Sequence, residues 1–174
     1  MNIGLLGFGV VGRGVYDITA KRQDMQVKKV LCLEDITLPD AEVTKDFNSI
    51  LNDETIDTVV EAMGGVHPAY EFVRAAMEAG KNIVTSNKAL VTTCYDELMP
   101  LAKEKNLLFM VTYTYMGHVT AKHIRNAIAR GNLGKIRTVM AEYPQGWLAY
   151  EGDFGGKQGA WRCDPAQSGG VNCL

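Results

Sequence analysis

The sequence predicts a doubly wound α/β domain with a parallel sheet, mainly because apolar runs alternate with amphipathic segments along it. The short apolar runs would bury both faces of a strand, and the segments between them have the apolar spacing of a helix. Strands of this kind are typical of a parallel sheet that helices cover on both sides. A glycine-rich turn directly after the first run is a second indication of this fold class.

The individual elements follow from the same periodicity. The predicted strands are residues 2–7, 27–33, 56–63, 82–85 and 107–113, and the predicted helices are residues 11–23, 67–80 and 94–106. The second of these helices ends at Gly80, because glycine commonly caps a helix C-terminus. The third is expected in spite of Pro100.

The pattern changes after residue 112, where we expect the first domain (1–112) to end. A helix at 118–134 and a strand at 135–146 are predicted to begin a second, incomplete α+β unit over residues 113–174. From Pro144 onwards glycines are frequent and periodicity is almost absent, so this segment cannot bury a core of its own. We expect it to be ordered against something else, or to belong to a longer protein.

Composition narrows the classes of function. The formal net charge is −2 and the isoelectric point is about 5.9, which argues against a nucleic-acid partner. No apolar run approaches the roughly 20 residues of a membrane span. The four cysteines lie far apart, so a reducing, cytoplasmic setting is expected. The three histidines lack metal-ligand spacing, so no metal site is expected.

The motif G-F-G-V-V-G lies between the first predicted strand and the first predicted helix. In that context Gly7 permits a tight turn, Gly9 lets the backbone approach a pyrophosphate, and Gly12 lets helix and strand pack closely. Val10 and Val11 belong to the same cofactor-binding turn, at a helix N-terminus whose free N–H groups favour phosphate. The motif predicts a Rossmann-type dinucleotide-binding domain, and a purely structural glycine turn is the alternative.

Glu34 closes the second predicted strand 22 residues after Gly12, close to the spacing of ~20 that a ribose-binding acid has in such domains. A carboxylate at this position accepts hydrogen bonds from the 2′-hydroxyl and repels a 2′-phosphate. We therefore expect Glu34, with Asp35 as the second choice, to favour NAD over NADP. The alternative is that both residues are solvated loop acids.

Lys88 and the pair Gly64 and Gly65 are expected at the same edge of the sheet as the glycine turn, because parallel strands all end at one edge. The two glycines suit a backbone that passes close to the cofactor, although a plain turn would also use them. Lys88 comes three residues after the fourth predicted strand. An ammonium group there could donate to a substrate oxygen and pass a proton as hydride moves. A solvated loop lysine is the alternative.

Residues 1 to about 110 resemble the nucleotide-binding half of homoserine dehydrogenase. The matching stretches are GLLGFGVVGRGV, IDTVVEAMGG, AYEFVRAAMEAGKNIVTSNKALV and LMPLAKEKN, of which S-N-K-A-L is the most specific. The resemblance implies that Lys88 lies between the nicotinamide and the hydroxyl or carbonyl group of the substrate. It also implies cofactor contacts for Gly64, Thr85 and Ser86.

Beyond residue 112 the chain resembles a different family, the glucose-fructose oxidoreductases and inositol dehydrogenases. The stretches TYTYMGHVTAKHIRNAIARGNLGKIRTVMAEYPQGW and GAWRCDPAQSGGVNCL carry this second resemblance. It implies that residues 113–174 are a partial substrate or dimerisation domain. The E-K-P context of that family's lysine is absent from this sequence, as are the catalytic Asp and Lys of the homoserine dehydrogenase substrate domain.

Three hypotheses of function remain. The first is an NAD(P)-dependent dehydrogenase of amino-acid biosynthesis that interconverts homoserine and aspartate semialdehyde. The second is a sugar or polyol dehydrogenase, and the third is a dinucleotide-binding module without turnover. All three imply NAD as the cofactor, with NADP as the alternative, and the first two imply a small-molecule substrate. Whether the protein forms a homo-oligomer is left open.

Overall fold

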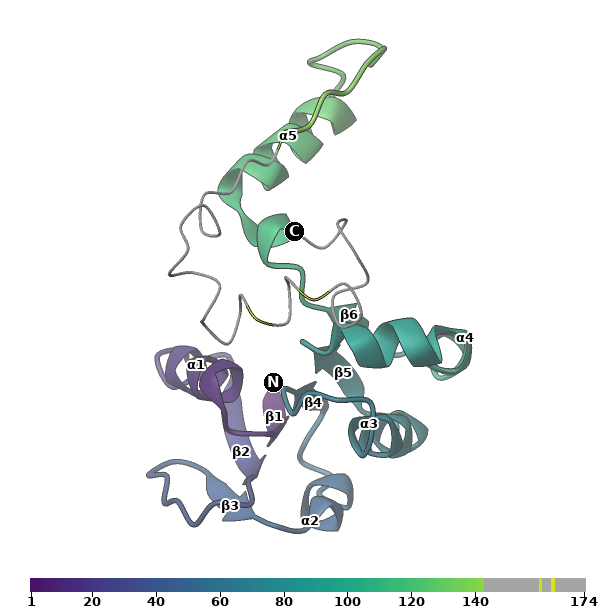
Figure 1. Ribbon diagram of the computed structural model, residues 1–174. Helices are drawn as coiled ribbons and strands as arrows, with labels where there is room; N and C mark the ends of the chain where they lie inside the picture. Colours follow the sequence, from purple (N-terminus) through teal and green to yellow (C-terminus); the bar gives the residue numbers. More distant parts are fainter. Residues whose placement is uncertain (143–159, 161–163, 165–174) are drawn as a thin grey trace. The chain divides into compact units, whose positions relative to one another are not determined.

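The computed structural model describes residues 1–142, 160 and 164 (Figure 1). The strands are β1 (Asn2–Leu6), β2 (Gln26–Leu31), β3 (Glu42–Thr44), β4 (Thr58–Glu61), β5 (Asn82–Thr85) and β6 (Phe109–Val111). The helices are α1 (Val10–Thr19), α2 (Phe47–Leu51), α3 (Ala69–Glu78), α4 (Lys88–Glu104) and α5 (Val119–Ala129), with a 3₁₀ turn at Thr114–Gly117.

Within these described residues, six parallel strands form one sheet in the order β3-β2-β1-β4-β5-β6. The chain builds outward from β1 to β3 on one side, then returns to build from β4 to β6 on the other. The doubly wound α/β fold is therefore confirmed. The point between β1 and β4 where the direction reverses is where open sheets of this kind bind ligands.

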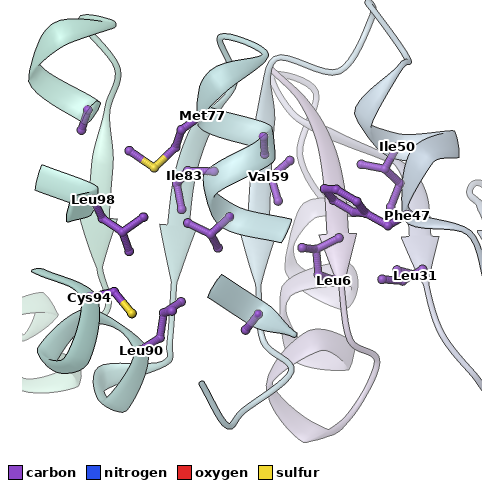
Figure 2. Close-up of a cluster of buried hydrophobic side chains, with 14 of the residues drawn as sticks. Leu6, Leu31, Phe47, Ile50, Val59, Met77, Ile83, Leu90, Cys94 and Leu98 are labelled. Atoms are coloured by element: carbon purple, nitrogen blue, oxygen red, sulfur yellow. The ribbon is translucent and has the colours of Figure 1, made fainter. Parts of the chain in front are cut away.

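The two faces of the sheet bury separate sets of side chains. Leu6, Val59 and Ile83 pack beneath α2, α3 and α4 on one face (Figures 1 and 2). Leu5 and Val60, their neighbours along β1 and β4, point to the opposite face, where α1 packs. Because each fully buried side chain of this size contributes about 1.5–3 kcal/mol, this alternation fixes the register of the central strands.

Four elements differ from the sequence prediction. The short elements β3 and α2 were not predicted, because three and five residues are too few to show a period. Helix α4 begins at Lys88 rather than at residue 94, because Asn87 caps it. Backbone angles at Cys94 are non-helical, so α4 is irregular where the predicted helix would start. Residues 135–142 form no strand, and the rest of the strand predicted at 135–146 lies outside the described residues.

The chain divides into two compact units, Met1–His123 and Ile124–Leu174. The predicted domain end at residue 112 directly follows β6. Helix α5 crosses the division between the units, and within the described structure none of its residues is buried. Among the described helices, none combines the length and apolar character needed to cross a membrane.

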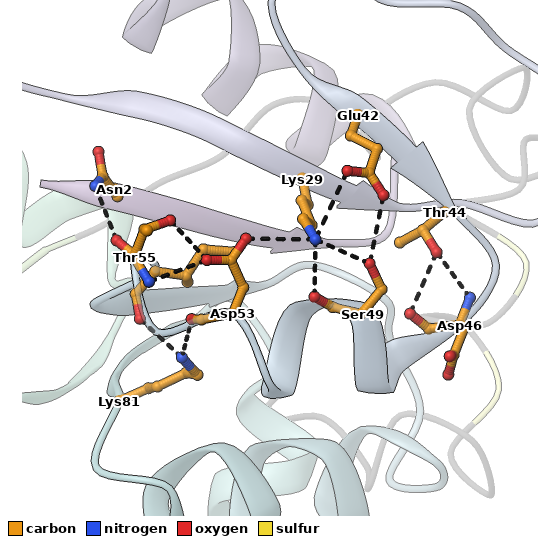
Figure 3. A network of polar contacts seen from close by, with 10 residues as sticks. Asn2, Lys29, Glu42, Thr44, Asp46, Ser49, Asp53, Thr55 and Lys81 are labelled. Carbon is orange, nitrogen blue, oxygen red and sulfur yellow. Dashed lines mark hydrogen bonds and ion pairs between the residues drawn. The ribbon is translucent and has the colours of Figure 1, made fainter.

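A cluster of polar side chains holds the loop between α2 and β4 (Figure 3). The ammonium group of Lys29 lies 3.3 Å from Oδ2 of Asp53 and donates to the carbonyl oxygen of Ser49 at 3.1 Å. Lys81, which is 5% exposed, donates to the carbonyl oxygens of Asp53 and Ile56, both at 2.8 Å. Burial lowers the pKa of Lys81, and the two hydrogen bonds offset part of the loss of solvation.

The carboxyl group of Asp53 is the main acceptor in this cluster. Its Oδ1 accepts hydrogen bonds from the hydroxyl group of Thr55 at 2.6 Å and from the Thr55 N–H at 3.0 Å. The Thr55 hydroxyl is the largest cause of the lowered pKa of Asp53, and Lys29 adds to it. A carboxyl group whose pKa is lowered by folding stabilises the fold above its unfolded pKa, and it loses this effect as the pH falls through its folded pKa.

We predict that Thr55→Val lowers the free energy of unfolding by about 1 kcal/mol near neutral pH, because Asp53 loses a hydroxyl donor. The deficit should shrink as the pH falls below the ordinary carboxyl value of 3.8 and through the lowered pKa that Asp53 has in the folded protein, since Asp53 becomes protonated in both proteins there. Urea unfolding of the two proteins at about pH 7 and about pH 3 measures the deficit. Equal deficits at both pH values would contradict this role of Thr55.

Candidate functional site

The carboxyl ends of β1, β4 and β5 meet at one edge of the sheet, because Leu6, Glu61 and Thr85 stand in register. The pairing continues one residue further. The N–H of Ala62 donates to the carbonyl oxygen of Leu6 at 2.8 Å, and the N–H of Ser86 donates to that of Glu61 at 3.1 Å. The segments that carry the predicted site residues therefore leave the sheet side by side.

Two of the three glycines in the turn after β1 are required by the fold itself. Gly7 has a φ of +91°, and a Cβ atom there would lie 2.9 Å from the carbonyl oxygen of Ala62. A Cβ atom at Gly12 would lie 2.1 Å from the carbonyl oxygen of Gly7. The predicted tight turn and close helix packing are thus present.

Gly9 has a different environment. Its φ of −75° is open to any residue, and no heavy atom of the described residues lies within 4 Å of a Cβ built on it, its chain neighbours excepted. Neither backbone conformation nor packing in this part of the chain explains a glycine here. Gly9 is the N-cap of α1, where glycine is common, and the open space beside it also leaves room for a ligand to approach the backbone.

The N-terminus of α1 is open to a ligand. Gly9 is its N-cap and supplies no side chain to bond the first N–H groups, and the first turn carries no acidic residue. Val10 and Val11 as whole residues are 92% and 51% exposed in the described structure. Free N–H groups and the helix dipole make such a terminus a site for phosphate.

A pocket of about 410 Å³ adjoins the glycine turn. Phe8 and Gly9 line it from the turn, Met63 and Phe72 line it from the chain after β4, and Glu34 lines it from the end of β2. The volume falls in the range of about 300–1,000 Å³ that is usual for ligand sites. The pocket thus has room for the adenosine half of a dinucleotide.

The two acids after β2 have different surroundings. Glu34 lines the pocket, and its side chain is 75% exposed. Asp35 is 92% exposed and forms an ion pair with Lys45 at 2.5 Å. The hydrogen bond from Lys45 lowers the pKa of Asp35. Of the two, Glu34 therefore has the position expected for a ribose ligand.

Glu61 is the most deeply buried acid of this edge, and the sequence analysis did not select it. The residue is 0% exposed in the described structure. Its Oε1 accepts from the N–H of Met63 at 2.8 Å and from the N–H of Gly64 at 3.4 Å, and its Oε2 accepts from the hydroxyl group of Thr85. A carboxylate at the end of the apolar run T-V-V-E was the available signal, because buried acids require partners.

Asn87 continues this network to α4, and it too was missed. Its N–H donates to the hydroxyl oxygen of Thr85 at 2.9 Å, and its Oδ1 accepts from the N–H of Leu90 at 3.0 Å. Its Nδ2 donates to the carbonyl oxygen of Gly65. Thr85 itself is fully buried. The Gly64–Gly65 loop and the start of α4 are therefore held by one set of hydrogen bonds.

Lys88 is the first residue of α4, and its side chain is exposed. Its ammonium nitrogen lies 5.8 Å from the centre of the Tyr113 ring, within the range of a cation–π contact. A helix N-terminus disfavours a cation by about 0.3–1 kcal/mol, so helix stability does not explain a lysine here. Gly64 and Gly65, with φ of +82° and +74°, adopt the left-handed conformation on the adjoining loop.

The structure thus brings all of the predicted site residues to one edge. They are Gly7, Gly9, Val10, Val11, Gly12, Glu34, Gly64, Gly65, Thr85, Ser86 and Lys88. Within the described residues no group of three or more His, Cys, Asp or Glu side chains is arranged to hold a metal ion.

The comparisons with known proteins identify the same region. The family model of the homoserine dehydrogenase NAD-binding domain matches residues 7–112. A homoserine dehydrogenase from Methylobacillus glycogenes is 34% identical over 119 residues, which are 60% of this chain and 29% of that protein. One from Neisseria gonorrhoeae is 29% identical over 155 residues, 80% of this chain and 35% of that protein. The chain thus spans about a third of the length of these curated relatives.

Solved structures agree with the sequence matches. The crystal structure of Staphylococcus aureus homoserine dehydrogenase aligns with a TM-score of 0.58 and 32% identity, over 64% of this chain and 32% of that one. A Bacteroides fragilis protein assigned to the oxidoreductases aligns with a TM-score of 0.63 and 26% identity, over 78% of this chain and 44% of that one. Because the family model extends from the glycine turn to the end of β6, the chain belongs to the family of homoserine dehydrogenase NAD-binding domains.

Proposed function

We propose that this chain is the cofactor-binding part of an NAD(P)-dependent dehydrogenase that acts on homoserine. The open N-terminus of α1 carries the proposal, because Gly9 leaves space there for a ligand to approach the backbone and a pocket of about 410 Å³ adjoins it. The membership in the family and the relatives named homoserine dehydrogenase support the reaction.

The residues of the edge fit a dinucleotide in three places. The N–H groups at Gly9, Val10 and Val11 hold the pyrophosphate, and Glu34 accepts from the adenosine ribose. The Gly64–Gly65 loop and Ser86 line the path towards the nicotinamide. Thr85 acts through Glu61 and Asn87, because its own hydroxyl is engaged by both. When bound, the cofactor supplies a hydride acceptor or donor.

Lys88 is the proposed proton-handling residue. Its ammonium group donates to the hydroxyl or carbonyl oxygen of the substrate, where it stabilises the charge that develops as the oxygen loses or gains a proton. The cap at Asn87 sets the first turn of α4 and thereby the position of this side chain.

A sugar or polyol dehydrogenase is the second candidate. The resemblance of the segment beyond residue 112 to the glucose-fructose oxidoreductases supports it, and the alignment with the Bacteroides fragilis protein, which covers more of this chain than the Staphylococcus aureus structure does, is consistent with an oxidoreductase of either kind. Assays with homoserine and with a panel of polyols, each with NAD and NADP, separate the two reactions. Binding of NADH without turnover of any of these substrates would favour a dinucleotide-binding module.

We predict that Gly9→Val abolishes binding of NADH and leaves the fold intact, because the added side chain occupies space that the described protein leaves open. Titration followed by NADH fluorescence measures the affinity, and circular dichroism checks the fold. Gly14→Val is the matched control, since Gly14 also has no described heavy atom within 4 Å of its Cβ position and lies in the same helix. Unchanged NADH affinity in Gly9→Val would refute the proposed pyrophosphate site.

Lys88→Ala is expected to leave the affinity for NADH unchanged and to lower kcat for homoserine oxidation by about 10²- to 10⁴-fold, the usual range for loss of a general acid or base. Lys103→Ala is the control, because Lys103 is an exposed lysine in the last turn of the same helix. Steady-state rates of NADH formation compare the three proteins. A rate for Lys88→Ala within a few-fold of the wild type would mean that Lys88 is a solvated lysine.

A further inference from the structure

The ribose end of the pocket carries cations as well as acids. Nη2 of Arg13 lies 3.8 Å from Oε2 of Glu34, and Asp35, the residue after Glu34, forms an ion pair with Lys45. Glu34 and Lys45 both line the pocket. The four formal charges sum to zero, so this end of the pocket does not present the uncompensated negative charge that strict exclusion of a 2′-phosphate requires.

Arg13 is anchored independently of Glu34. Its Nε donates to the carbonyl oxygen of Phe8 at 3.1 Å, and its guanidinium carbon lies 5.1 Å from the centre of the Phe8 ring. Phe8 stands in the glycine turn and lines the pocket. The guanidinium group is therefore held beside the pocket by two contacts that do not involve an acid.

The ion pair between Arg13 and Glu34 can open readily. The side chains are 57% and 75% exposed, and pairs this exposed contribute little to stability. A phosphate group offers the guanidinium a stronger partner, because a phosphate monoester carries about −1.5 to −2 charges near neutral pH and can accept two parallel hydrogen bonds, whereas the contact with Glu34 is a single approach at 3.8 Å. Glu34 can then turn into solvent while Arg13 stays over Phe8.

We propose that Arg13 determines cofactor specificity by binding the 2′-phosphate of NADP(H), so that the site accepts both dinucleotides. Glu34 accepts a hydrogen bond from the 2′-hydroxyl of NAD(H) and thereby favours NAD(H) over NADP(H). Arg13 reduces this preference because it binds the 2′-phosphate of NADP(H). The proposal rests on the proposed dinucleotide site and concerns only its ribose end.

The test is a pair of titrations of the full chain, with NADH and with NADPH, at physiological salt. The wild type is expected to bind both within about tenfold of each other, with NADH the tighter. Arg13→Gln should lower the affinity for NADPH by at least about tenfold and the affinity for NADH by less than about threefold, because only NADPH loses a contact between its phosphate and a charged side chain. Raising the salt should reduce this difference.

Two further variants complete the test. Arg22→Gln is the matched control, because Arg22 is an exposed arginine paired with Asp24 and does not line the described cofactor pocket. Glu34→Gln, which keeps Arg13 and removes the negative charge beside it, should raise the affinity for NADPH. If Arg13→Gln leaves the affinity for NADPH unchanged, or lowers the affinities for both cofactors equally, Arg13 does not bind the 2′-phosphate. If the wild type binds neither cofactor, the proposed function fails and this inference fails with it.

Discussion

The carboxylate of Glu61 is buried at the end of β4, and the hydrogen bonds it accepts come from two separate segments of the site. An acid in this position is expensive to bury unless donors surround it. Those donors are the N–H of Met63, at the start of the glycine loop, and the hydroxyl of Thr85, which in turn accepts from Asn87 at the cap of α4. The loop that faces the cofactor and the helix that carries Lys88 thus share one buried acceptor.

The three glycines of the turn after β1 have different roles, although they belong to one motif. Gly7 and Gly12 could not carry side chains without a collision with backbone atoms, so the fold alone requires them. Gly9 has free space in the described structure, so no collision within these residues requires a glycine there, and this is the space that the proposed cofactor would use. A match to the motif alone does not distinguish the three glycines. The structure separates the two that the fold requires from Gly9, beside which a ligand has room.

The sequence was sufficient for the parts of the fold that repeat a period. Five of the six strands in the described residues and the shared edge of the sheet followed from apolar runs and from the geometry of parallel strands. It was insufficient for β3 and α2, which are too short to show a period. The roles of Glu61 and Asn87 depend on partners 24 and 22 residues away in the chain, Thr85 and Gly65, which local pattern cannot supply.

The glycine loop and the start of α4 are held as one unit through Glu61. Amide hydrogen exchange in Thr85→Val can detect this coupling, since valine keeps the shape of threonine and removes the hydroxyl link. We expect the amides of Met63 and Asn87 both to exchange about tenfold faster in the variant, which corresponds to a loss of roughly 1.4 kcal/mol, while the amide of Leu5 in β1 is unchanged. Faster exchange at Asn87 with Met63 unaffected would contradict it.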